Sequence, residues 1–253
     1  MPALYNTFLF VEPQKHYLIY GSAVLHQIVG ANKKAGQAIT ELMGDDANPD
    51  KIKQELETLK PVVFSGIGHG NIGIFTVECT TPLLHAENSE ELALMKERIV
   101  DLCSCLTAQQ LGPALIDAGA VAYTGYREEF WFYTGDEPGT TRAVQSPFLA
   151  EFQFVASLLN GRSTGDARAD QLARYDEEIS FWTVGAGKDN PDAMELSRIL
   201  EINKGISTFL GQSTVSPSPR PAILASSFLS PQIVFTVPAL FVIYMAYKEL
   251  QKH

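Results

Sequence analysis

The chain has 253 residues, 45% of them hydrophobic and 19% charged, a composition typical of a folded protein and unlike that of a disordered polyelectrolyte. Its formal net charge of −10 argues against nucleic acid as a partner, because a nucleic-acid binder needs a basic face that neutralises phosphates. Three cysteines are too few for a disulfide framework and suit a reducing compartment. Residues 1–20 lack the pattern of a secretory signal, so we expect this part of the chain to stay in the cytoplasm.

Apolar runs alternate with helical patterns along residues 1–212. The expected strands are Tyr5–Val11, His16–Tyr20, Pro61–Ser65, Ile99–Cys105 and Ala120–Thr124. The expected helices are Ala35–Met43, Pro49–Leu59 (capped by Asn48), Glu90–Arg98, Ala108–Ala118, Phe148–Leu159 and Ala167–Phe181. This alternation predicts an α/β fold with a parallel, doubly wound sheet and a ligand cleft at the carboxyl ends of its strands.

Two of the expected strands are followed by residues that can carry chemistry. His69 follows Pro61–Ser65 within the sequence GIGHGN, whose glycines let the backbone turn and a ligand approach closely. Cys105 ends the next expected strand and precedes a helix, whose dipole should lower the pKa of the thiol. If the two strands are neighbours, imidazole and thiol meet, although 36 positions separate them. A cysteine with a histidine base is a standard arrangement for acyl transfer.

The order of these features resembles the caspase-like clan of cysteine peptidases, which includes caspases, legumains, gingipains, separase and the CHAT-domain proteins. PVVFSGIGHG is similar to the clan's apolar strand that ends in His-Gly. RIVDLCSCLTAQQLGPALIDAGAVAYTGY is similar to its strand ending in Cys, then a helix, Gly-Ala and another strand. FLAEFQFVASLLNGRSTGDARADQLARYDEEI is similar to its later pair of helices. The likeness covers Lys51–Ile179, and the CHAT and gingipain branches match best.

This resemblance implies a caspase-like three-layer α/β/α sandwich that hydrolyses the peptide bonds of a polypeptide substrate. It implies Cys105 as the nucleophile, through a thioester, and His69 as the general base. The backbone amides of Gly70 and Cys105 match the oxyanion-hole donors, and Cys103 matches the small residue two positions before the nucleophile. No metal or other cofactor is expected to take part. The Gln-Ala-Cys string of caspases is absent, so strict aspartate specificity is not implied.

The substrate pocket should be lined by residues that come after the last expected strand. The candidates are Tyr123, Gly125, Tyr126, Glu128 and Glu129. Carboxylates at the pocket floor would favour Arg or Lys at the cleavage site. The alternative is that these acidic residues form a solvated loop.

Two other kinds of function could draw on the same residues. The chain holds the ligand types of a zinc site, but their spacing matches no C-x2-C or H-x3-H pattern; they are His69, Cys79, His85, Cys103 and Cys105. GIGHGNIG lacks the Lys-Ser/Thr of a phosphate-binding loop. The main rival to the peptidase is a catalytically silent caspase-like interaction module tethered to a membrane.

The end of the chain differs in composition from the rest. Residues 213–221 are rich in Ser and Pro and indicate a linker after a domain of residues 1–212. Ala222–Tyr247 holds no charged residue and is long enough to span a bilayer, with Pro238 tolerable in a membrane helix. We expect residues 222–253 to form a transmembrane segment and short tail, with the catalytic domain on the cytoplasmic side. A buried core segment or a partner-binding helix would be the alternative.

Overall fold

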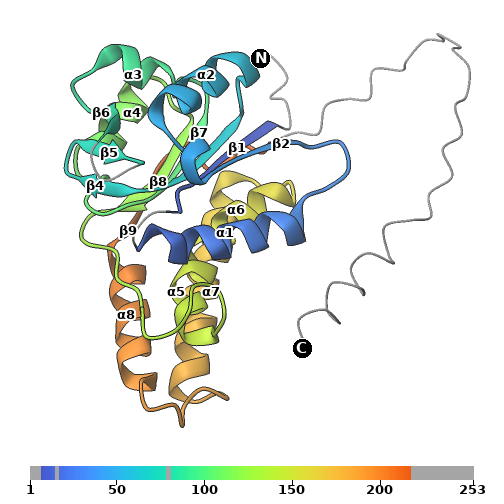
Figure 1. Cartoon of the computed structure of the whole chain (residues 1–253), viewed down its shortest axis with the longest axis vertical. Coiled ribbons are helices and arrows are strands. Elements are labelled where there is room, and N and C mark those ends of the chain that lie inside the picture. The colour runs from blue at the N-terminus through green and yellow to red at the C-terminus, as the bar shows by residue number, and fades with distance from the viewer. Residues whose placement is uncertain (1–6, 15–16, 78–80, 218–253) are drawn as a thin grey trace, which may run out of the picture. The chain divides into compact units, whose positions relative to one another are not determined.

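A six-stranded sheet forms the centre of the fold in the computed structural model, which describes residues 7–14, 17–77 and 81–217 (Figure 1). The first five strands in spatial order run parallel, and the last is antiparallel to its neighbour. In that order the strands are β2 (Ala38–Met43), β1 (Thr7–Glu12), β3 (Val63–Ile67), β7 (Ile99–Cys103), β8 (Ala122–Tyr126) and β9 (Ser207–Gly211). The prediction of an α/β fold with a mostly parallel sheet is confirmed.

A second, antiparallel sheet of three short strands is inserted between β3 and β7 along the chain. Its strands are β4 (His69–Asn71), β5 (Ile74–Thr76) and β6 (Pro82–His85). β4 begins two residues after β3 ends. The chain therefore leaves the central sheet and enters this small sheet at His69.

Helices pack against both faces of the central sheet and give it two cores. On β1, Phe8 and Phe10 belong to one core, and Leu9 and Val11 to the other, as the alternation of side chains along a strand requires. The first core is completed by α1 (Leu18–Asn32), α5 (Arg142–Glu151), α6 (Gln153–Leu159) and the start of α7 (Thr164–Thr183). The second is completed by α2 (Pro49–Leu59), α3 (Ser89–Ala93) and α4 (Leu111–Asp117). The last helix is α8 (Ala193–Ile206), which packs on α7.

Two expected elements were assigned the wrong type. The expected strand His16–Tyr20 overlaps α1, whose buried residues Leu18, Leu25 and Ile28 follow the period of a helix. The expected helix Ala35–Met43 is instead strand β2, which pairs with β1 along its whole length. Both errors come from short apolar runs, in which the periodicity of a helix cannot be distinguished from that of a strand.

Other expected elements are present with different ends. α2 is confirmed in full, and the Asn48 side chain accepts a hydrogen bond from the Lys51 amide at 3.0 Å. β7 ends at Cys103, two residues before the expected end, and α4 begins at Leu111, three residues late. The expected helix Phe148–Leu159 is divided at Phe152 between α5 and α6.

The expected membrane segment, residues 222–247, lies outside the described residues. Within the described ranges, no helix is long and apolar enough to cross a membrane. The first residues of the expected linker are described and pack on the start of α7. There the backbone carbonyls of Ser213 and Val215 accept hydrogen bonds from the amides of Gly165 and Thr164, at 2.7 and 2.8 Å.

Candidate active site

The register between β3 and β7 brings the two predicted catalytic residues to the same edge of the sheet. The strands are parallel neighbours, with Ile67 opposite Cys103 as the last pair. The Gly68 amide also donates to the Cys103 carbonyl at 3.3 Å. His69 and Cys105 each lie two residues beyond this last pair. The prediction that the two strands are neighbours is confirmed.

The backbone at Gly70 approaches the Cys105 turn closely. A Cβ atom at position 70 would lie 2.2 Å from both the Cys105 carbonyl oxygen and the Ser104 hydroxyl. It would also lie 2.8 Å from the Thr107 methyl group. Only glycine allows β4 to pack this tightly against the turn that carries Cys105.

His69 and Cys105 line one cavity of about 140 Å³. One side of the cavity is made by the first residues of α1, including Leu18 and Gly21, and by Ile67 at the end of β3. An aromatic wall is made by Phe130, Phe132 and Phe148, which also pack on one another. The remaining lining residues are Tyr17, Gly68, Cys103 and Ser104. The cavity is therefore mostly apolar away from the histidine and the thiol.

The two described cysteines differ in accessibility. Cys103 is 4% exposed and belongs to the core, where burial raises the pKa of its thiol well above the ordinary value. Cys105 is partly exposed, and its Sγ accepts a hydrogen bond from the Phe130 amide at 3.4 Å. Of the two thiols, that of Cys105 is the one a substrate can reach.

The pKa of the Cys105 thiol is raised. Burial is the main cause; the hydrogen bond from the Phe130 amide opposes it, and the charge of Glu129 adds to it. The prediction that this pKa is lowered is wrong, and Cys105 does not directly precede a helix, because residues 104–110 lie outside helices and strands and α4 begins only at Leu111.

The five residues expected to line the substrate pocket lie elsewhere. Tyr123 and Tyr126 are fully buried, and their hydroxyl groups bond to Thr107 and Glu151, respectively. Gly125 is buried beside them, whereas Glu128 and Glu129 are exposed. None of the five lines the cavity at Cys105. Tyr123 and Tyr126 belong to the core because β8 is covered by helices on both faces.

The aromatic wall was missed in the sequence. Phe130 and Phe132 come after β8 within the sequence EEFWFY, in a segment outside helices and strands. The signal that could have found them is this run of aromatic residues directly after a central strand. Periodicity gives no hint of it, because the segment belongs to no regular element.

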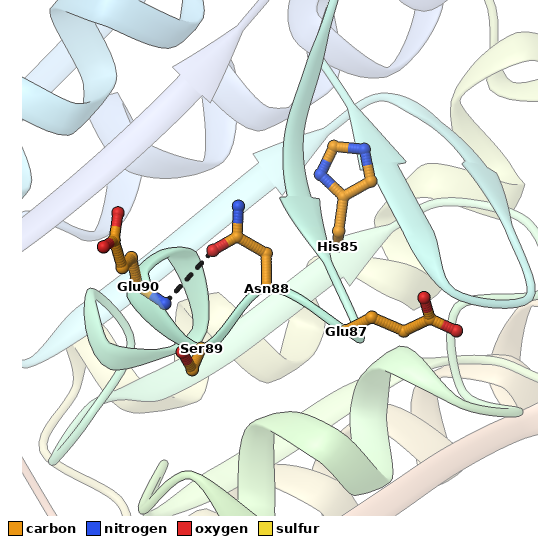
Figure 2. A pocket seen from close by; sticks show the side chains of 5 residues that line it. All are labelled: His85, Glu87, Asn88, Ser89 and Glu90. Atoms are coloured by element: carbon orange, nitrogen blue, oxygen red, sulfur yellow. Dashed lines mark hydrogen bonds between the residues drawn. The ribbon is translucent and has the colours of Figure 1, made fainter.

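A wider hollow of about 520 Å³ at the start of α3 offers no comparable chemistry (Figure 2). It is lined by residues between His85 and Glu90. The Asn88 side chain caps α3 by accepting from the Glu90 amide at 3.1 Å, as the dashed line in Figure 2 shows. His85 is engaged through Nδ1, 2.8 Å from a carboxylate oxygen of Glu91. The polar groups of Asn88 and His85 are therefore engaged in local hydrogen bonds.

Of the described histidines and cysteines considered as zinc ligands, His69, Cys103 and Cys105 line the cavity described above, whereas His85 lies at the hollow beside α3. Cys79 lies outside the described residues. Of the described residues, those whose ligand atoms come together closely enough to hold a metal ion are Glu12, His26 and Glu41. They are separate from the residues that line the cavity at Cys105.

Comparison with known proteins assigns no family to this chain. No family model matches it, and no curated protein sequence matches it. The likeness to caspase-like peptidases therefore rests on the sequence motifs alone.

Proposed function

We propose that the protein is a cysteine endopeptidase with Cys105 as the nucleophile and His69 as the general base. The observation that carries the proposal is that both residues line one cavity, each two positions beyond the last residue pair of β3 and β7. In a parallel sheet this edge is where ligands bind. Cys105 is partly exposed and His69 is exposed, so both are accessible to a substrate, which supports the same conclusion.

The proposed chemistry is that of a thiol and a basic imidazole that line the same cavity. His69 accepts the proton of the Cys105 thiol while the sulfur attacks the carbonyl carbon of the scissile peptide bond. The backbone amides of Gly70 and Cys105 are proposed to donate to the developing oxyanion. The protonated His69 then gives its proton to the leaving amine, which leaves a thioester on Cys105. Water, deprotonated by His69, hydrolyses the thioester and regenerates the thiol.

The fold is proposed to be the caspase-like three-layer α/β/α sandwich, closest to the CHAT and gingipain branches. The order of elements supports this assignment: a strand followed by His69-Gly70, a strand followed by Cys105, a helix, and a further strand. Two separate cores on the two faces of one sheet are what a three-layer sandwich requires.

The substrate side chain that enters the cavity is proposed to be apolar. Phe130, Phe132 and Phe148 offer no hydrogen-bond partner to a charged group, and none of the cavity's lining residues carries a carboxylate. The volume of about 140 Å³ suits a side chain of the size of a benzene ring. Basic specificity through the exposed Glu128 and Glu129 stays a prediction that a peptide panel would test.

A catalytically silent interaction module is the second candidate. The observation in its favour is that burial raises the pKa of Cys105, so less of the reactive thiolate is present at neutral pH. Such a module would keep the cavity as a binding site for an apolar peptide side chain. Covalent labelling separates the two functions, because only an activated thiol reacts quickly with a peptidyl electrophile.

The test is labelling of the full chain with a panel of peptidyl acyloxymethyl ketones that differ in the P1 residue. We expect labelling of the wild type and of Cys103→Ala, and loss of labelling in Cys105→Ala and His69→Ala. The preferred P1 residue reports specificity: a preference for Arg or Lys would contradict the apolar cavity. No labelling of any folded form, with calcium tried, would favour the silent module.

Attachment to a membrane through Ala222–Tyr247 is proposed from sequence alone, because this segment lacks charge over a length that can span a bilayer. The domain is proposed to face the cytoplasm. Fractionation tests the attachment. Release of the protein by carbonate or high salt would contradict it.

A further inference from the structure

A second cluster of reactive groups lies on the first two strands and α1. Glu12 is the last residue of β1, Glu41 lies on the neighbouring edge strand β2, and His26 lies on α1, which packs on β1. Their ligand atoms all lie within 4.8 Å of one another. The His26 Nδ1 atom is 2.7 Å from a carboxylate oxygen of Glu41 and 3.9 Å from one of Glu12.

The Glu12 carboxylate is completely buried and has no donor group as a partner among the described residues. Its exposed fraction is 0%, and neither oxygen accepts a hydrogen bond from a donor group in the described part of the chain. A hydrogen bond to the Glu41 side chain requires one of the two carboxyl groups to be protonated. An unpaired carboxylate in the interior is costly, so buried charges are normally paired or coordinate a metal ion. The imidazole nitrogen His26 Nδ1, at 3.9 Å, is beyond hydrogen-bond distance.

The spacing of the three ligand atoms suits a small divalent cation. Ligand atoms around a tetrahedral Zn²⁺ ion lie roughly 3.4 Å apart, given metal–ligand distances of about 2.1 Å. The two separations, 2.7 and 3.9 Å, bracket this value, and the shorter one is a hydrogen bond between His26 and Glu41 that the ion would replace. One imidazole nitrogen with two carboxylates is a zinc-type ligand set, whereas Mg²⁺ and Ca²⁺ prefer oxygen ligands alone.

We infer that Glu12, His26 and Glu41 form a binding site for Zn²⁺. The ion would place a positive charge against the two carboxylates and supply the buried Glu12 with the partner it lacks. His26 is 54% exposed, so the ion can reach the site from solvent and retain water as a fourth ligand. The site would fasten α1 to β1 and β2. Because α1 also lines the cavity at Cys105, the ion would hold one wall of that cavity in place.

The competing explanation is a proton shared between the two carboxyl groups. Without a cation, burial and the neighbouring Glu41 raise the pKa of Glu12 to about 8, so Glu12 is protonated at neutral pH. A protonated Glu12 needs no metal ion. The experiment must therefore distinguish a cation from a proton.

The experiment measures Zn²⁺ binding to the full chain by calorimetry and its melting temperature with and without Zn²⁺. All forms carry Cys105→Ala, so that the proposed catalytic thiol cannot bind the metal. We expect one equivalent of Zn²⁺ to bind at this site and to raise the melting temperature. His26→Ala, Glu41→Gln and Glu12→Gln should each weaken binding by about tenfold or more.

His85→Ala is the matched control, because His85 makes a similar contact with one carboxylate, at 2.8 Å, and is not part of this cluster. Binding should survive in this variant. His26 and Glu41 are not fully buried, so their variants keep the test valid if Glu12→Gln does not fold. The inference would be overturned if His26→Ala and Glu41→Gln bound Zn²⁺ with the affinity of the unsubstituted site. An absence of binding, or a response to Mg²⁺ or Ca²⁺ and none to Zn²⁺, would also overturn it.

Discussion

At the scale of single residues, Gly70 leaves no room for a side chain next to the turn that carries Cys105. Replacing it by alanine would put a methyl group 2.2 Å from the Cys105 carbonyl oxygen, so the turn that carries the thiol must move. We expect Gly70→Ala to reduce the rate of covalent labelling at Cys105 by about tenfold or more, since a shift near 1 Å can cost roughly 10²-fold in rate.

Gly73→Ala is the control for this prediction. It lies in the same small sheet region, where a new Cβ would meet its nearest atoms only at 3.4 Å. Labelling of Gly73→Ala should stay close to that of the wild type, and circular dichroism should show that both variants fold. Equal rates for the two variants would mean that the close approach at Gly70 does not position the thiol.

The pH dependence of labelling reports the state of the Cys105 thiol. Burial raises its pKa above the ordinary value of 9.0, and only the thiolate attacks an electrophile. The rate of alkylation by a small reagent such as iodoacetamide should therefore keep rising with pH through 7 and beyond 9. A plateau near pH 7 would contradict this expectation and would indicate a thiolate stabilised by the charged imidazole of His69.

That His69 and Cys105 lie at one edge of the sheet was predictable from the sequence, and the pocket wall was not. Both residues come just after buried parallel strands, and because those strands are neighbours, the segments at their carboxyl ends meet at one edge of the sheet. The pocket depends on Phe130 and Phe132, whose position is set by packing on α5 and not by any local pattern. Tyr126 was assigned to the pocket because sequence alone does not show that α5 and α7 bury it.

At the scale of elements, α2 shows how a local signal fixes a helix end. The Asn48 side chain accepts from the Lys51 amide, and Pro49 occupies the first turn. Asn48→Ala should lower the free energy of unfolding by about 1 kcal/mol, because one helix amide loses its partner. Urea denaturation measures this change. Glu57→Ala, on the exposed face of the same helix, should leave stability nearly unchanged, and an equal loss there would contradict the capping role.

The two misassigned elements, α1 and β2, were decided by tertiary contacts. β2 becomes a strand because each of its residues from Ala38 to Met43 lies opposite a residue of β1. α1 places Val24, Leu25 and Ile28 in the core beneath the sheet, a pattern that only a longer window would detect. By contrast, α2 and α7 carry their own capping residues and were found correctly.

At the scale of the whole molecule, buried acids make stability depend on pH. Burial raises the pKa of Glu151 from 4.5 to about 8 and that of Asp101 from 3.8 to about 7. Between about pH 4.5 and 7 both are protonated in the folded protein and ionised in the unfolded chain, so unfolding releases protons. The free energy of unfolding should therefore fall as the pH rises through this window and on to about 8. Each group contributes up to about 1.4 kcal/mol per pH unit to this fall.

Glu151→Gln tests this prediction, because glutamine imitates the protonated side chain and can still accept from Tyr126 and Gln171. The slope of unfolding free energy against pH, from urea titrations at pH 5 to 8, should become shallower than in the wild type. Glu177→Gln changes an exposed carboxylate and should leave the slope unaltered. If the slope of Glu151→Gln equalled that of the wild type, the Glu151 carboxyl group would ionise normally in the folded protein.

The measurement that tests the central claim most directly is turnover of a fluorogenic peptide library by the purified full chain. Wild type, Cys105→Ala and His69→Ala are compared at equal concentration, with Cys103→Ala as the matched cysteine control. We expect hydrolysis by the wild type and by Cys103→Ala, and none above background by Cys105→Ala and His69→Ala. Hydrolysis that persists in Cys105→Ala would contradict this expectation.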